Sequence, residues 1–282
     1  MKITVLMENR PSETDGRLAF EWGLSLHVAL EGRTVLFDTG ASGRFVENAE
    51  RLSVDLAAVD AAVLSHHHFD HGGGLRRFLT LNSRAKVSLG EPPEGECYVK
   101  IYGVVKKYAG LDRALAGDFP GRFELVCRPA EILPGVFLIP HIGGTHPRPA
   151  GNRHLFVKRG GAFVRDAFAH ELVMAIKENG KLVVFTGCSH SGVLNMVDAV
   201  AQSFEGVPIQ AVIGGFHLTG LPPFHGIAGS REEVREIAAA LLDYPVERVY
   251  TGHCTGDKAF SVLQSVMGER IVDLRTGSRI EF

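Results

Sequence analysis

Four histidines and an aspartate fall within the six residues from His66 to His71, and three glycines follow at positions 72–74. Imidazole nitrogen and carboxylate oxygen are ligands of zinc and similar divalent ions. The apolar run Ala61–Leu64 leads into this segment and predicts a buried strand, so the histidines lie in the loop at its end. A short loop with these groups has enough ligands for two ions.

The spacing within the loop divides its side chains into two sets. In an extended segment, residues two apart point the same way, so His66 and His68 can converge on one ion. Asp70 and His71 lie beyond a bend and can reach a second ion, whereas His67 points away and is expected to pack or to meet solvent. A polar surface loop or an engineered histidine tract would have a similar composition, but such tracts sit at chain ends.

Three further histidines each follow a short apolar run and a glycine, in the segments 185–190, 213–217 and 250–254. Loops at one edge of a sheet build the sites of layered α/β folds. We expect His190 and His253 to be metal ligands. For His217, metal contact, substrate contact and a structural hydrogen bond are all open.

Other polar residues near these loops have two interpretations each. Asp38 follows the run Thr34–Phe37 and either accepts the free N–H of a ligand histidine or forms a turn. Cys188 is either a thiolate ligand or a small buried residue, and burial is favoured, while Cys254 is expected to pack inward. The irregular segment 140–153 is interpreted as an exposed loop in preference to a wall of the site, which would involve His141, His146 and His154.

The elements that position these loops follow from apolar periodicity and turn residues. In the first half we expect helices over 43–52 and 73–79, and strands over residues 1–6, 24–30, 34–37, 61–65, 123–127 and 135–139. In the second half we expect strands over 182–185, 210–213 and 248–250, and a closing hairpin of 271–274 and 279–282 around Gly277. Further helices are expected over 168–178 (ending at Gly180), 192–204 and 257–267, and after a capping box at Ser230–Glu233.

Composition limits the class of protein. The chain has 282 residues, of which 45% are hydrophobic, and it favours a single domain over 1–282 with sheets inside and helices outside. Its net charge of −2 argues against non-specific nucleic-acid binding. Four cysteines without C-x-x-C spacing suggest no disulfide framework, and no signal peptide or membrane-length apolar stretch is seen. We therefore expect a cytoplasmic protein without a membrane partner.

The pattern His66-x-His68-x-Asp70-His71, with His190 and His253 downstream, resembles the signature of the metallo-β-lactamase superfamily. The resemblance implies a four-layer αββα sandwich, in which two mixed sheets pack face to face with helices on both outer faces. It also implies a metal site at one edge of the sandwich.

Longer motifs resemble the 7,8-dihydropterin-6-yl-methyl-4-(β-D-ribofuranosyl)aminobenzene 5′-phosphate synthase-like branch of that superfamily. They are Glu21-x-Gly23-Leu24-Ser25-Leu26, Leu36–Gly40, Thr186–His190 with Gly192, Ile213–Leu218 and His253–Gly256. Three positions depart from the patterns of related proteins. Cys188 stands where many superfamily hydrolases have a metal-bridging aspartate, segment 140–148 replaces Thr-Gly-Glu-Ile-Pro-Arg, and His170-Glu171 replaces Asp-Glu. Substrate recognition can therefore differ from that of the named synthase.

These observations lead to the hypothesis of a site for two divalent ions. Two sets of ligands are expected, namely His66, His68 and His190 for the first ion, and Asp70, His71 and His253 for the second. A single tightly bound ion is the alternative. Zinc is the first expectation for nitrogen-rich ligation, and iron or manganese would also suit these ligands.

Metal binding lowers the pKa of water from about 16 to about 7, which makes a hydroxide nucleophile at neutral pH. Asp70 would orient that nucleophile, and His217 would contact a substrate oxyanion. We expect a metal-dependent hydrolase that acts on a small ester, lactone or phosphodiester. The alternatives are a pterin-type synthase, an iron-dependent oxidoreductase and a binding module without turnover. The expected partner is a small molecule, not nucleic acid, and the oligomeric state is open, with a dimer among the options.

Overall fold

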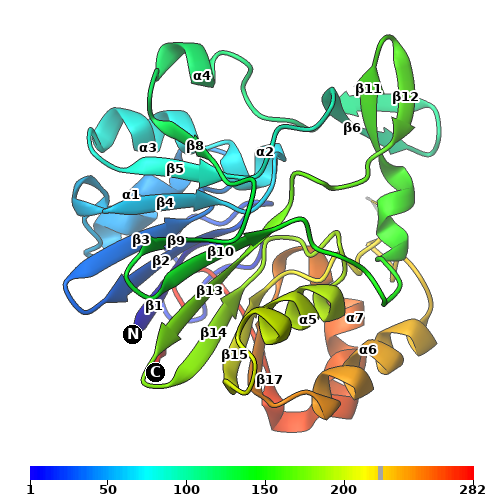
Figure 1. The fold of residues 1–282 in the computed structure, drawn as a ribbon. Helices are drawn as coiled ribbons and strands as arrows, with labels where there is room; N and C mark the ends of the chain where they lie inside the picture. Colours follow the sequence, from blue (N-terminus) through cyan, green and yellow to red (C-terminus); the bar gives the residue numbers. More distant parts are fainter. Residues whose placement is uncertain (222–224) are drawn as a thin grey trace.

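Two seven-stranded mixed sheets pack face to face between layers of helices in the computed structural model, which describes residues 1–221 and 225–282 (Figure 1). The expected αββα sandwich is confirmed. The first sheet has the order β18 (Arg279–Glu281), β1 (Lys2–Met7), β2 (Ser25–Leu30), β3 (Arg33–Phe37), β4 (Ala61–Leu64), β5 (Lys86–Leu89) and β8 (Phe123–Leu125).

The second sheet mirrors this arrangement. Its order is β17 (Ile271–Asp273), β16 (Val246–Thr251), β15 (Ile209–Gly214), β14 (Lys181–Phe185), β13 (Leu172–Glu178), β10 (Val136–Pro140) and β9 (Ala130–Leu133). The neighbours from β14 to β17 are parallel, and the remaining pairs are antiparallel. In the first sheet, β3, β4, β5 and β8 are parallel.

The core has three layers because the strands are covered on both faces, which explains their nearly continuous apolar sequences. In β14, Val183 and Phe185 pack between the sheets, whereas Leu182 and Val184 face the outer helices. Helices α5 (Val193–Ser203), α6 (Arg231–Asp243) and α7 (Asp257–Met267) cover the second sheet. Helices α1 (Arg44–Arg51) and α3 (Leu75–Leu81) cover the first.

Several local expectations are confirmed. Helix α7 has the expected bounds, and α6 begins with the expected capping box, in which the Ser230 hydroxyl accepts from the N–H of Glu233 at 3.0 Å. The short helices α2 (Phe69–Gly72) and α4 (Leu115–Asp118) complete the helical elements, with 3₁₀ turns at Leu56–Ala58, Ala150–His154, His253–Thr255 and Gly268–Arg270. Among the described residues, no helix is long and apolar enough to span a bilayer.

A third, four-stranded sheet projects beside the ends of the two main sheets (Figure 1) and was not expected from the sequence. Its order is β12 (Ala162–Arg165), β11 (Leu155–Arg159), β6 (Glu96–Ile101) and β7 (Val105–Tyr108). Segment 100–109 mixes basic and apolar residues, so its pattern did not identify a strand. The sheet places residues 97–109 beside the histidine loops.

The helix expected over 168–178 is wrong, because Leu172–Glu178 forms strand β13. The five residues from Leu172 to Ile176 are all buried, and a short buried run does not distinguish helix from strand. The decisive signal was Asn179-Gly180, where both residues have positive φ, of 52° and 76°. This pair is typical of a two-residue hairpin turn, and it joins β13 to β14.

The closing hairpin expected around Gly277 is also wrong. Strand β17 pairs in parallel with β16 in the second sheet, whereas β18 pairs antiparallel with β1 in the first. Gly277, with a φ of 83°, lies in a turn that carries the chain from one sheet to the other. A turn residue between two apolar runs indicates a change of direction, but it does not say which strands pair.

Candidate metal centre

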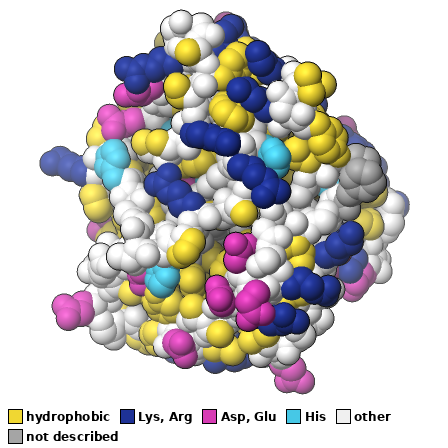
Figure 2. Space-filling view, turned by 90° about the vertical axis from the view of Figure 1, so that its right-hand side faces the viewer, with side chains coloured by type: hydrophobic (Ala, Val, Ile, Leu, Met, Phe, Trp, Pro, Cys, Tyr) yellow, Lys and Arg dark blue, Asp and Glu magenta, His cyan; other side chains and the backbone are white. Residues whose placement is uncertain are grey.

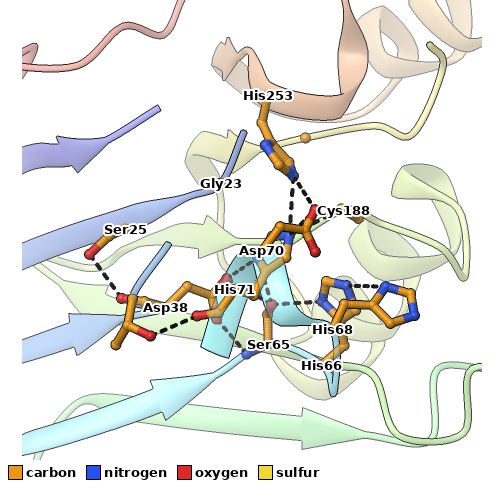
Figure 3. A network of polar contacts seen from close by, with 12 residues as sticks. Gly23, Ser25, Asp38, Ser65, His66, His68, Asp70, His71, Cys188 and His253 are labelled. Atoms are coloured by element: carbon orange, nitrogen blue, oxygen red, sulfur yellow. Dashed lines mark hydrogen bonds and ion pairs between the residues drawn. The ribbon is translucent and has the colours of Figure 1, made fainter. Parts of the chain in front are cut away.

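The carboxyl ends of five strands meet at one edge of the sandwich, where side chains from both sheets come together (Figure 3). Strands β3 and β4 of the first sheet end at Asp38 and at the histidine loop. Strands β14, β15 and β16 of the second sheet lead to Cys188–His190, His217 and His253. Parallel neighbours end at the same edge, so residues far apart in sequence become neighbours in space.

The first group of candidate ligands is His66, His68 and His190. One ring nitrogen from each lies within 4.8 Å of the others, and all three side chains are buried. The Nε2 of His66 lies 3.0 Å from the Nδ1 of His68. The structure thus brings together the three residues predicted for the first ion.

The second group contains Asp70, His71 and His253, as predicted, together with Cys188. The Nε2 of His71 lies 3.2 Å from the Nε2 of His253 and 3.1 Å from the Sγ of Cys188. An Asp70 carboxylate oxygen lies 3.5 Å from His253 Nε2 and 4.0 Å from His71 Nε2. Cys188 is buried, as the sequence favoured, and its thiol also faces the candidate ligands.

These separations are close to those between the ligands of a shared cation. Ligand atoms of a tetrahedral zinc ion, bonded at about 2.0–2.3 Å, lie about 3.3–3.7 Å from one another. The five separations given above run from 3.0 to 4.0 Å. His190 Nε2 is buried without a hydrogen-bond partner, which is costly unless a ligand supplies one. The residues present therefore fit a bound divalent ion.

Asp38 and Ser65 orient two of these histidines from behind. Asp38 accepts from His71 Nδ1 at 2.6 Å and from the hydroxyl and backbone N–H of Ser65, at 2.7 and 2.8 Å. The Ser65 hydroxyl lies 2.9 Å from His66 Nδ1. The proposed contact of Asp38 with a ligand histidine is confirmed. Gly187 makes room for this arrangement, since a Cβ there would lie 2.2 Å from Ser65 Oγ.

Two asparagines and two buried glutamates hold His190 and His253 in place. These four residues were not predicted from the sequence. His190 Nδ1 lies 3.0 Å from Asn152 Oδ1, and His253 Nδ1 lies 2.9 Å from Asn9 Oδ1. Glu171 accepts from the backbone N–H of His190, and Glu8 from that of His253. In His66, His71, His190 and His253 a polar partner therefore occupies Nδ1, which leaves Nε2 to face the cation site.

Trp22 is a further contact that was not predicted. Its indole N–H donates to Asp70 Oδ2 at 2.9 Å, and its ring centroid lies 5.4 Å from that of His253. Trp22 occupies the variable position of the Glu21-x-Gly23 motif. A Cβ on Gly23 would lie 2.8 Å from the carbonyl oxygen of Asp70, so the glycine allows this segment to approach the histidine loop.

The other histidines divide into those near the site and those away from it. The ring of His217 lies 4.3 Å from that of His190, and His154 lines the same cavity. His146 instead contacts Asp198 and Tyr244, and His141 lies on the surface near Glu91. His67 points away, as expected, and its Nε2 lies 3.0 Å from the carbonyl of Gly90.

A cavity of about 430 Å³ opens onto both groups of candidate ligands. Its wall is mostly apolar and is formed in part by the third sheet, through Val99, Ile101 and Leu155, and by Ala109, which follows β7. Figure 2 views this side of the molecule and shows Lys and Arg side chains gathered over its upper half. Among the described lining residues, Lys107 is the single Lys or Arg.

Burial sets the charge of the candidate ligands. It lowers the pKa of His66 and His190, and it lowers that of His68 to about 3. Burial acts to raise the pKa of Asp70, but the nearby His71 and His253 outweigh it and hold that pKa below its usual range. At neutral pH His66, His68 and His190 are therefore neutral and Asp70 is ionised, which are the forms that bind metal. Burial acts to lower the pKa of His253 as well, but the nearby Cys254 and Asp70 outweigh it and raise that pKa to about 9, so metal binding there must displace a proton.

These shifts predict that the metal-free protein loses stability as the pH falls from about 7 to about 4. Imidazoles of the unfolded chain take up protons near pH 6.5, whereas His66, His68 and His190 stay neutral in the folded protein. Each of the three histidines therefore lowers the free energy of unfolding, by at most about 1.4 kcal/mol for each unit that the pH falls within that window. Above about pH 7.5 their contribution is constant. Urea unfolding at pH 7.5, 6 and 5 measures the effect. His68→Asn should reduce the pH slope, and the exposed control His141→Asn should not; equal slopes would contradict the prediction.

An αββα sandwich with histidine-rich loops at one edge defines the metallo-β-lactamase fold. The model of the metallo-β-lactamase superfamily matches residues 24–253, and the chain belongs to this superfamily. The crystal structure of Tm1679, a metal-dependent hydrolase of the β-lactamase superfamily, is 31% identical, with a TM-score of 0.82, and the match covers 100% of this chain and 99% of that one.

Two other similar proteins support different levels of classification, namely the branch of the superfamily and the fold alone. The 7,8-dihydropterin-6-methyl-4-(β-D-ribofuranosyl)-aminobenzene-5′-phosphate synthase of Methanocaldococcus jannaschii is 29% identical over 278 residues, which cover 92% of this chain and 90% of the synthase. Zn²⁺-bound PqqB from Methylobacterium extorquens is 13% identical over the full length of both chains, with a TM-score of 0.58. The first likeness supports the predicted branch, and the second shows the fold alone.

Proposed function

We propose that this protein is a dinuclear, metal-dependent hydrolase of small molecules. The observation that carries the proposal is the pair of buried ligand groups, which lie side by side at the floor of a mostly apolar cavity. Small-molecule sites have this character, with a few polar groups set in an apolar wall. Macromolecular substrates would need a more open surface.

Each group would hold one ion. His66, His68 and His190 would bind the first. Asp70, His71 and His253 would bind the second, and Cys188 would be an additional ligand on that side. Zinc suits these nitrogen and sulfur donors best, while iron or manganese would rely more on the histidines and Asp70.

Two divalent ions would supply an acidified water and a positive field for the scissile group. Asp70 would keep its negative charge and accept a proton or orient the nucleophile, while Trp22 holds its carboxylate in place. His217 would donate to the oxygen of the substrate that gains negative charge. Its Nδ1 is buried without a partner, so the side chain has an unused polar atom close to His190.

The proposal is tested by metal analysis and by substrate turnover with the untagged protein. At least two equivalents of metal are expected after reconstitution, one for each of the two groups, and His190→Ala should bind one fewer than wild type. A panel of phosphodiesters, lactones and carboxylic esters should include a compound hydrolysed only by the metal-loaded protein. Fewer than one equivalent under metal-replete conditions would overturn the dinuclear site. Iron in the protein as isolated, with oxygen uptake, would point to the oxidoreductase alternative.

A second candidate function is a pterin-type synthase reaction, favoured by the likeness to the M. jannaschii synthase. Aminobenzene-linked ribosyl phosphates belong in the panel for this reason. Turnover of such a compound by group transfer, without hydrolysis, would favour the synthase over the hydrolase. The same ligand residues would serve either reaction, so metal content alone does not distinguish them.

Lys107 indicates that the substrate carries a negative charge. It lines the cavity, whereas its neighbour Lys106 turns to the other side of β7 and stacks on Phe163, with Nζ 4.5 Å from the ring centroid. We expect Lys107→Met to raise KM for an anionic substrate about tenfold with little change in kcat, since a charged hydrogen bond contributes about 1.5 kcal/mol. The matched control is Lys106→Met. Equal effects of the two substitutions, or an equal effect on a neutral substrate, would contradict this role.

A further inference from the structure

A third buried cluster of metal-ligand side chains lies beyond His68, outside the two groups described above. It consists of Cys97, Asp166, His170 and a ring nitrogen of His68, each offering an atom within 4.8 Å of the others. The thiol residue Cys97 is 2% exposed, and the side chains of Asp166 and His170 are 3% and 1% exposed. Thiolate, carboxylate and imidazole together form a mixed donor set that zinc accepts.

Separate elements hold the cluster in place. Cys97 lies in β6, Asp166 follows β12, and His170 precedes β13. The N–H of Phe168 donates to Asp166 at 2.8 Å, and the backbone N–H of His67 donates to His170 Nδ1 at 3.2 Å. These contacts direct the second carboxylate oxygen of Asp166 and the Nε2 of His170 toward each other.

The contacts within the cluster are long for hydrogen bonds. His170 Nε2 lies 3.2 Å from Asp166 Oδ2, whereas a charge-assisted N–H···O bond is usually about 2.7–2.9 Å. The Sγ of Cys97 lies 3.9 Å from the same oxygen. Ligands around a tetrahedral zinc ion lie about 3.3–3.7 Å apart, so small movements would bring these atoms to that spacing.

His68 supplies an independent observation. Its Nδ1 faces His66, so its Nε2 lies on the other edge of the ring, away from His66, as Figure 3 shows. This Nε2 is buried and has no hydrogen-bond partner. A buried polar atom in this state marks a place where a ligand or a water would be favourable.

We propose that Cys97, Asp166 and His170 form a third site for a thiophilic divalent cation, with His68 closing its remaining side. On binding, the ion would form bonds to Cys97 Sγ and to His68 Nε2, and the Cys97 thiol and the N–H at His68 Nε2 would each release a proton to solvent. His68 would then be an imidazolate shared between this ion and the first ion of the catalytic centre. The thiolate and the Asp166 carboxylate then balance the double positive charge. Only His68 is shared with the proposed catalytic centre.

The ion has its own route to this site. Cys97 and His67 line a second cavity of about 380 Å³, which is separate from the one that opens onto the two catalytic groups. An ion can therefore reach Cys97 without passing the substrate cavity.

Titration of the metal-free protein with Co²⁺ tests the proposal. Wild type should bind three equivalents, with near-ultraviolet thiolate-to-cobalt absorption from Cys97 and Cys188. Cys97→Ala should lose one equivalent and part of that absorption, and Asp166→Asn should weaken the same step if Cys97→Ala does not fold. The control Cys127→Ala, at an exposed cysteine, should match wild type.

Two results would overturn the third site. One is an unchanged ion count and absorption in both Cys97→Ala and Asp166→Asn, and the other is a wild type that never exceeds two equivalents. Failure of the catalytic proposal would look different. In that case His190→Ala would bind as many ions as wild type, while the absorption that depends on Cys97 would persist.

Discussion

Replacing Asp70 by asparagine is expected to lower kcat by about 10²–10⁴-fold, the usual contribution of a positioned acid or base. Asparagine has nearly the same shape, so Trp22 can still donate to its side-chain oxygen, and folding should be unchanged. The negative charge is lost, however, and with it both the ligand strength toward the second ion and the ability to accept a proton. The measurement is kcat on a hydrolysed substrate with both ions at saturation, together with metal content.

Two control variants separate the charge of Asp70 from its setting. Trp22→Phe removes the 2.9 Å hydrogen bond but keeps the carboxylate, and we expect a loss of tenfold or less. Asp112→Asn, at an exposed position paired with Arg76, should leave kcat unchanged. Turnover of Asp70→Asn within threefold of wild type on every accepted substrate would mean that Asp70 has no catalytic role.

Replacing Asp38 by alanine is expected to have the second largest effect, on stability as well as on metal binding. The substitution leaves His71 Nδ1 and the hydroxyl and N–H of Ser65 without their acceptor in a site where Asp38 is 1% exposed. Each unsatisfied buried group costs about 1–3 kcal/mol, so the free energy of unfolding should fall by about 3 kcal/mol or more. Metal affinity should fall about 10–100-fold, because His71 loses the group that orients it.

Urea unfolding of the metal-free protein and competition with a chelator measure these two quantities separately. Asp38→Asn keeps an acceptor and the shape of the side chain, so its effects should fall between those of wild type and Asp38→Ala. Unchanged metal affinity in Asp38→Ala would show that His71 does not need this contact or does not bind the ion.

The candidate ligands could be predicted because each one lies in the segment that follows a buried strand. A buried apolar run that ends in glycine and histidine identifies both the strand and its loop, so neighbouring parallel strands bring His190 and His253 to the edge that holds His66. For Cys188 the sequence favours a packing residue over a ligand. It does not decide between them, because cysteine occurs both as a small buried residue and as a metal ligand. The structure places the buried Cys188 with its Sγ 3.1 Å from His71 Nε2, within reach of the second group of candidate ligands.

The supporting residues could not be predicted in this way. Asn9, Trp22 and Asn152 lie in irregular or 3₁₀ segments, and their approach to the histidines depends on packing between distant parts of the chain. The third sheet could not be predicted for the same reason. Strand β6 pairs with β7 nearby in the sequence, but it also pairs with β11, which lies more than fifty residues away. Strand β13 was missed for a local reason, because the Asn179-Gly180 turn was interpreted as the end of a helix.

Each of the two groups in the candidate metal centre draws ligands from both main sheets. His66 and His68 come from the first sheet and His190 from the second, and likewise Asp70 and His71 face Cys188 and His253. A bound ion would therefore act as a non-covalent cross-link between the two halves of the sandwich. Because ligand binding to the folded state alone adds to stability, chelation should raise hydrogen exchange throughout the layer between the sheets, far beyond the loops that hold the ions.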